Sequence, residues 1–137
     1  MSDTITTALT FLYATLSGDT TLMALVSGVY QDIAPVGTVP DYVTFGIQSP
    51  GNDTLTSTAV RILSEPLALV RAIGPQADMS NLSAAATRID TLLKLVRNDP
   101  ATGVLCCYRV SPFYLPEPQL VNGAPWVEIG GLYRIEV

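Results

Sequence analysis

The chain has 137 residues, of which 48% are hydrophobic and 14% are charged, with a formal net charge of −5 and no histidine. This length suits one domain with a sizeable core, and an acidic chain without a basic cluster argues against binding nucleic acid through its phosphates. There is no basic leader and no apolar run of about 18 residues, so we expect neither a signal peptide nor a membrane span.

Charge is distributed unevenly along the chain. Residues 1–60 hold five aspartates and no lysine or arginine, whereas residues 61–137 hold seven acidic and seven basic residues. So low a charge on so apolar a chain indicates that other chains cover part of its surface. The alternative is an ordinary apolar-rich monomer.

The first forty residues predict two helices and a connection. Leucines and isoleucine at helical spacing predict a first helix that begins at Asp3 or Thr4 and ends at Gly18. Its apolar side holds Ile5, Leu9, Leu12 and Leu16. A second, short helix is predicted over residues 22–26, and residues 29–40 are expected to form an irregular connection because proline and glycine interrupt them.

A long hairpin is predicted next. Residues 42–48 alternate between apolar and polar side chains, which is typical of a half-buried strand. The polar stretch Ser49–Ser57 is expected at the hairpin tip, with a return strand over Ala59–Ile73. Pro66 predicts a bulge or an edge position within that strand.

The longest apolar stripe predicts a helix that packs against the sheet. The stripe consists of Met79, Leu82, Ala85, Ala86, Ile89, Leu92, Leu93 and Val96. We expect Ile89 and Leu92 at the centre of the helix–sheet contact. Asp90 and Lys94, four residues apart and in the favourable order, are expected to support the helix.

Two further strands are predicted after this helix. They cover Val104–Val110 and Trp126–Val137, with a long loop over Leu115–Pro125 between them, and Gly130-Gly131 predicts a bulge in the last strand. The order of elements is therefore α(α)ββαββ. It predicts an α+β fold with a mostly antiparallel sheet of about four strands and helices on one face, within a single domain over residues 1–137.

Residue types that carry chemistry are scarce. The lack of histidine removes the commonest general base and metal ligand, and no phosphate-binding glycine loop is present. Asn52-Asp53 with Asp32 or Asp41 lacks the spacing of a calcium loop, which favours a solvated loop. Cys106 and Cys107 are adjacent, so we expect two free thiols rather than a strained bond. We therefore expect no enzymatic activity, no metal and no cofactor.

Three segments in order resemble the tail terminator, or tail completion, proteins of long-tailed phages. Leu9–Tyr30 is similar to the family's first helix and the turn that follows it. Ile33–Phe45 resembles the family's Ala-Pro and Pro-Tyr-Val signature, although Asp41 intervenes between the proline and the tyrosine here. Pro66–Gly74, followed by a helix ending at 89–93, is similar to the family's core strand and helix. The stretch from residue 112 to 126 resembles the family least.

The resemblance implies a structural protein of the virion, located in the tail-neck region and assembled in the host cytoplasm. Such proteins form a ring, usually a hexamer, that caps the tail tube, stops its polymerisation and presents the surface on which the head docks. The implied partners are the tail tube protein and a head-completion or connector protein, and DNA passes through the ring without specific binding. No membrane partner is implied.

Two alternatives to a tail terminator remain. A head-completion, stopper or connector-adaptor protein of the neck has a similar size. A small enzyme or ligand-binding domain is disfavoured by the missing histidine and by the lack of a pocket motif.

The candidate contacts to a neighbouring subunit or another partner are Asn52, Asp53, Leu55, Arg61, Arg71, Leu120 and Trp126. Leu55 is the lone large apolar residue of the predicted hairpin tip and is the best single anchor. Arg61 and Arg71 are interpreted either as outward-facing side chains with solvated heads or as ion-pair partners for the acidic first half of a neighbouring subunit. The hairpin tip is interpreted either as a docking element or as a solvated turn without a partner.

Overall fold

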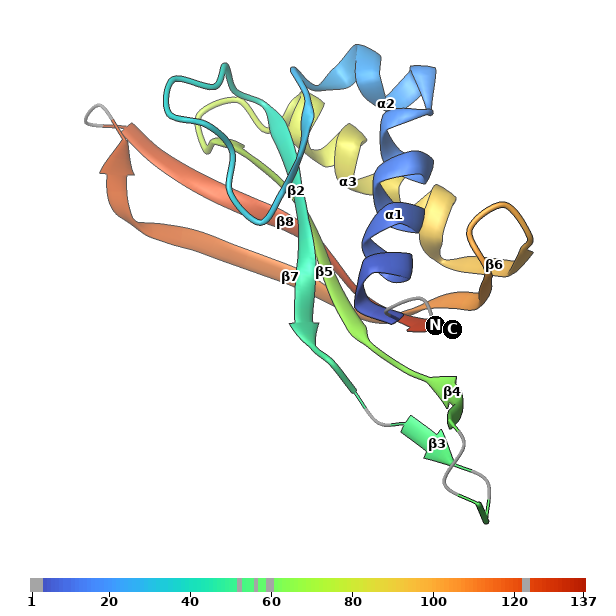
Figure 1. Cartoon of the computed structure of the whole chain (residues 1–137). Coiled ribbons are helices and arrows are strands. Elements are labelled where there is room, and N and C mark those ends of the chain that lie inside the picture. The colour runs from blue at the N-terminus through green and yellow to red at the C-terminus, as the bar shows by residue number, and fades with distance from the viewer. Residues whose placement is uncertain (1–3, 52, 56, 59–60, 122–123) are drawn as a thin grey trace.

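The computed structural model of the chain, drawn in Figure 1, describes residues 4–51, 53–55, 57–58, 61–121 and 124–137, with the backbone alone at 61–62, 117–121 and 124. The elements in chain order are α1 (Thr4–Ser17), α2 (Thr20–Leu25), β1 (Val29–Gln31), β2 (Tyr42–Ser49), β3 (Asp53–Leu55), β4 (Arg61–Ser64), β5 (Leu67–Pro75), α3 (Ser80–Leu93), β6 (Leu95–Asp99), β7 (Val104–Val121) and β8 (Ala124–Glu136). Over these described residues, no helix combines the length and the apolarity that a membrane crossing requires.

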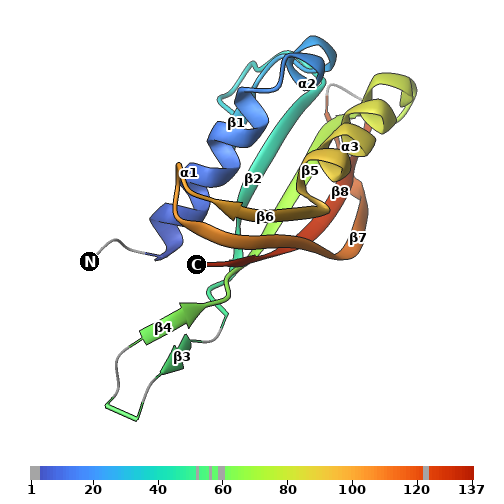
Figure 2. The ribbon, with the colours of Figure 1, turned by 90° about the vertical axis from the view of Figure 1, so that its right-hand side faces the viewer.

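The main sheet has six strands in the order β1-β2-β5-β8-β7-β6, and β3 and β4 form a separate two-stranded sheet. All strand pairings of the main sheet are antiparallel except that of β1 with β2, which is parallel. The α+β class and the placement of the helices on one face are confirmed (Figures 1 and 2). The expected number of about four strands is wrong, because β1 and β6 are added at the two sides of the sheet.

Strand β1 lies within the segment predicted to be irregular. Its backbone pairs with β2, since Val43 N–H donates to the Gly28 carbonyl at 3.0 Å and Asp32 N–H donates to the Phe45 carbonyl at 2.8 Å. Three residues are too few to produce a recognisable alternation, so only the tertiary pairing defines this strand.

The apolar stripe of the long helix ends earlier than predicted. Helix α3 stops at Leu93, and residues 95–99 form β6, so Val96 belongs to a strand. Val96 lies opposite Cys107 on β7 and packs against the core from there. Its spacing of three from Leu93 fits a helix, yet the same position fits a strand whose inner face is apolar.

The core lies between the helices and the inner face of the sheet. The largest fully buried side chains are Tyr133, Phe11, Phe45, Leu12, Leu16, Leu22, Leu82, Ile89, Leu93, Ile135, Val43 and Val70. Ile89 is 0% exposed, as predicted. Leu92 is only half-buried, so its predicted place at the centre of the contact is wrong, and Leu93 lies there instead.

The turn between α1 and α2 is bound to α3 by a charged pair. The Asp19 carboxylate accepts the Leu22 N–H at 2.8 Å and so caps α2. It also accepts two hydrogen bonds from Arg88, at 2.8 and 2.7 Å. The Arg88 hydrogen bond lowers the pKa of Asp19 from 3.8 to about 2, because it stabilises the ionised form.

Asp90 connects α3 to the sheet. Its carboxylate lies 3.4 Å from the Arg109 guanidinium and accepts a hydrogen bond from the Tyr133 hydroxyl at 3.2 Å. Burial, together with the nearby Asp90 charge, raises the pKa of Tyr133. Asp90 therefore binds Arg109 and Tyr133 across the helix–sheet boundary, whereas the prediction paired it with Lys94.

The last two strands form one long hairpin, so the prediction of a loop over Leu115–Pro125 is wrong. Strand β7 continues to Val121, far past the end of its pairing with β6 at Tyr108. The prolines at 112 and 116 are paired with β8 inside this strand. Proline is tolerated here because only one side of this part of β7 is hydrogen-bonded to another strand.

The predicted bulge at Gly130-Gly131 is also placed wrongly. The pairing of β5 with β8 runs through both glycines without a shift, and the irregularities lie in β7, between Arg109 and Ser111 and between Pro116 and Leu120. A Cβ atom at Gly130 would collide with the Val70 carbonyl. This glycine is therefore needed for the close approach of β5 and β8.

Candidate functional site

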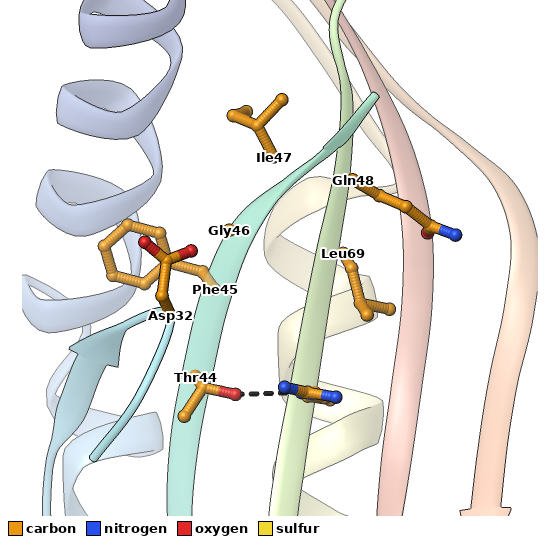
Figure 3. Close-up of a pocket in the computed structure, with 8 residues that line it drawn as sticks. Asp32, Thr44, Phe45, Gly46, Ile47, Gln48 and Leu69 are labelled. Atoms are coloured by element: carbon orange, nitrogen blue, oxygen red, sulfur yellow. Dashed lines mark hydrogen bonds between the residues drawn. The ribbon is translucent and has the colours of Figure 1, made fainter. Parts of the chain in front are cut away.

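The sheet face opposite the helices has a polar centre. Thr44 on β2 lies opposite Arg71 on β5, and both point away from the core. Arg71 Nε donates to Thr44 Oγ1 at 3.1 Å (Figure 3), and the Arg71 guanidinium forms an ion pair with Glu128 on β8. Thr44 and Glu128 are buried, at 2% and 4% exposure. These three residues therefore form a fixed polar cluster.

A shallow hollow of about 270 Å³ lies beside this cluster. The residues that line it are Asp32, Thr44, Phe45, Gly46, Ile47, Gln48, Leu69 and Arg71. Gly46 lets the Asp32 carboxylate lie directly on the sheet, because a Cβ at this position would collide with it (Figure 3). The arginine of the hollow is already bound to Glu128, so the hollow offers a surface rather than a set of reactive groups.

This geometry bears on the two interpretations of Arg71. Its side chain is 28% exposed, and its charge is balanced within the chain by Glu128. We therefore do not assign Arg71 to an ion pair with a neighbouring subunit. The side chain of Arg61, the other strand arginine, lies outside the described part of the chain.

Strands β3 and β4 form an arm that projects from one end of the sheet (Figures 1 and 2). The predicted hairpin is confirmed, except that β3 lies within the stretch Ser49–Ser57 predicted to be its tip. The return strand is interrupted at Glu65 and Pro66, as Pro66 indicated. The base of the arm is fixed by two hydrogen bonds between the backbones of Ser64 and Val137, at 2.9 and 3.0 Å. Near this base, the Ser64 hydroxyl also donates to Asp53.

Leu55 is 55% exposed on this arm, opposite Arg61 in the pairing of β3 with β4. Of the predicted contact residues, Asp53, Leu55 and Arg61 thus lie together on the β3–β4 arm. Asn52 lies outside the described residues. Arg71 lies apart from them, on the main sheet.

The two remaining candidates lie on the long hairpin. Trp126 is half-buried, and its ring packs against Tyr42 with a centroid distance of 6.2 Å. Leu120 pairs with Pro125 through the backbone, and its side chain is outside the described part. Strand β7 also exposes the apolar side chains of Leu105, Val110, Tyr114 and Leu115.

A second surface was not predicted from the sequence. A groove of about 620 Å³ runs between α1 and β1. Its lining residues are Thr6, Leu9, Thr10, Tyr13, Ala14, Val29, Tyr30, Gln31 and Phe45, none of them charged. Tyr13 is 54% exposed at this groove. One signal was available in the sequence: between residues 4 and 31 the chain carries one charged residue, Asp19.

The Asp41 carboxylate is partly buried. Asp41 Oδ1 is buried without a hydrogen-bond partner and lies against Gly74. Burial and the nearby Asp78 raise the pKa of Asp41. No group of three potential metal-ligating side chains is formed by the residues that the structure describes. A buried carboxylate oxygen without a hydrogen-bond partner is a local cost to folding.

The two cysteines are free thiols. Cys107 is buried, and its Sγ donates to the Leu93 carbonyl at 3.4 Å. Burial raises the pKa of Cys107 to about 12. A thiol with so high a pKa is a poor nucleophile, so Cys107 acts as a core residue.

Comparison with known proteins gives a likeness of fold. No protein-family model and no curated protein matches the chain. Among solved structures, the fold is similar to that of a chain described as "Virion of native gene transfer agent (GTA) particle", with a TM-score of 0.60 and 19% sequence identity. The alignment covers 99% of this chain and 100% of that chain. The two chains therefore share one fold over their whole length.

Proposed function

We propose that this chain is a structural protein of a phage-like virion and, within it, the tail terminator. The observation that carries the proposal is the likeness of fold, over the full length of both chains, to a chain from a gene transfer agent particle. The sequence resemblance to tail terminators supports the same conclusion independently of the structure.

In this role, copies of the chain form a closed ring, proposed to be a hexamer, on the end of the tail tube. The ring stops addition of tube subunits and presents the surface on which the head docks. A ring needs two different surfaces on each copy that fit one another. The projecting β3–β4 arm and the uncharged groove are two such surfaces at different places on the molecule.

The composition of the surface fits an assembly protein better than an enzyme. Large apolar side chains are exposed on the arm, on β7 and in the loop before β2, where Ile33 and Val36 are 82% and 107% exposed. Side chains of this kind are expected where partner proteins cover the surface. We propose no catalytic role, no cofactor and no membrane contact, and a location in the tail-neck region of the particle.

The decisive experiment is to remove the gene from a host that produces the particle and to measure tail length by electron microscopy. The proposal expects tails of uncontrolled length without heads, and restoration of normal tails by the intact chain. Tails of normal length without heads would contradict the terminator role and would favour a head-side connector protein. Light scattering on the purified chain adds a second criterion, since a hexamer supports the terminator and a dodecamer supports a connector adaptor.

A further inference from the structure

We infer that the groove between α1 and β1 receives the β3–β4 arm of a second copy of this chain, with Leu55 as the inserted side chain. The inference rests on the proposed function, because it assumes that identical copies meet. It assigns to that assembly a donor surface and an acceptor surface.

The groove has the properties of a protein contact. A helix on the surface of a monomer usually carries charged residues on its outer side, whereas α1 has none over its whole length. Contact regions are depleted of charged residues and enriched in tyrosine. Tyr13 and Tyr30 both line this groove, and the one charged residue between positions 4 and 31, Asp19, is bound to Arg88.

The arm has the properties of a donor. A two-stranded hairpin alone is marginally stable in water, and the described part of this arm is attached to its own main sheet through the backbone of Ser64 and Val137. All three residues of β3 are exposed. Leu55 therefore exposes an apolar side chain on an arm that projects from the body of the molecule (Figure 2).

The two surfaces fit each other in polarity and in size. An exposed leucine gains free energy on entering an apolar groove, and no charge has to be desolvated among the residues that line it. A groove of about 620 Å³ has room for several side chains of a hairpin. Among the exposed residues of β3, Leu55 is the apolar side chain that suits such a groove.

The arrangement also gives each copy one donor surface and one acceptor surface. Both views show the arm directed away from the body, so it does not return to the groove of its own chain. Each copy thus gives one arm and receives another through a heterologous contact. Contacts of this type form a ring where the rotation between copies closes, as the proposed function requires.

Disulfide trapping tests the inference directly. In a Cys106→Ser background, the variant Leu55→Cys/Ala14→Cys places one thiol on the arm and one in the groove. Under mild oxidation at the highest soluble protein concentration, we expect covalent dimers and a ladder of larger products. The matched control is Leu55→Cys/Ala84→Cys, since Ala84 is exposed on α3, away from the groove. No ladder with Ala14→Cys, or an equal ladder with Ala84→Cys, would overturn the inference.

A charge variant provides a second measurement. Ala14→Arg should weaken assembly about tenfold or more, because it places a charge in an apolar contact, whereas Ala84→Arg should leave assembly unchanged. Both variants should melt like the parent, since both alanines are exposed. A ring that forms normally with Ala14→Arg would refute the groove assignment and leave the proposed function standing. Trapping of Leu55 with Ala14 supports the groove whatever the tail-length phenotype.

Discussion

Arg88 binds both oxygens of Asp19 across 69 positions of sequence, with its Nε and one terminal nitrogen at 2.8 and 2.7 Å from them. The same carboxylate caps α2 through Leu22 N–H. One side chain therefore determines where α2 begins and how the first two helices are held against α3. A bidentate pair of this kind also fixes orientation.

Asp19→Asn should destabilise the fold modestly at pH 7. Asparagine keeps the cap but loses the charge, so we expect a loss of about 1 kcal/mol, whereas Asp19→Ala loses the cap as well and should cost about 1 kcal/mol more. Since the folded pKa is lowered from 3.8 to about 2, the stabilisation is complete above pH 3.8 and is lost as the pH falls through 2. Urea denaturation at several pH values measures this. A constant difference between parent and Asp19→Asn down to pH 2 would contradict it.

Asp41→Asn should have the opposite effect. The pKa of Asp41 is raised by burial and by Asp78, so the ionised carboxylate at neutral pH costs stability. Asparagine removes that cost, and we expect the melting temperature at pH 7 to rise by roughly 1–3 °C. Because the raised pKa favours the protonated form in the folded state, the gain should vanish below pH 3.8. Asp78→Asn, which removes the neighbouring charge while its amide oxygen can still accept from Ser80, should give part of the gain.

Ile89→Ala should cost more than Leu92→Ala. Ile89 is fully buried, and its truncation leaves a cavity worth about 2–5 kcal/mol. Leu92 is half-buried, so its truncation should cost roughly 1–2 kcal/mol. Chemical denaturation of the two variants side by side gives the comparison. Equal losses would mean that the solvent-facing side of α3 is placed wrongly.

Gly130→Ala should destabilise the sheet by about 1–3 kcal/mol or more. The added methyl group would collide with the Val70 carbonyl, which belongs to the backbone and has little room to move. Gly131→Ala meets the ring of Tyr133 at 3.1 Å, a less severe approach than the collision at Gly130. We therefore expect Gly131→Ala to be the milder of the two in a thermal melt. The reverse order would show that β5 and β8 separate easily at this point.

Local patterns were sufficient for the elements with strong periodicity. The helix over Thr4–Ser17, the strand over Tyr42–Ser49 and the break at Pro66 all follow from residues near them in sequence. The prediction failed where pairing between distant segments decides the structure. Val29–Gln31 forms a strand only because its backbone pairs with β2. The prolines of β7 led to the prediction of a loop, although this segment is a strand that pairs with β8.

The candidate site shows the same division. Leu55 was predicted as a contact because one large apolar residue in a polar stretch is a local signal. The structure places it exposed on the arm, and its role as a contact stays a prediction. The partner of Arg71 could not be identified, since Glu128 is distant in sequence and the register of β5 against β8 brings the two together. The groove between α1 and β1 required the fold, because its lining comes from three separate segments.

The prolines of β7 have a consequence for the behaviour of the protein in concentrated solution. Proline has no amide proton, and in a sheet its nitrogen points away from the partner strand. Pro112 and Pro116 both pair with β8, so the outer border of β7 lacks two of its donors. Another strand could not form a continuous set of backbone hydrogen bonds along this border. Natural sheets use prolines at their edges in this way to resist fibril formation. Copies of this chain are thereby prevented from polymerising without limit through that border.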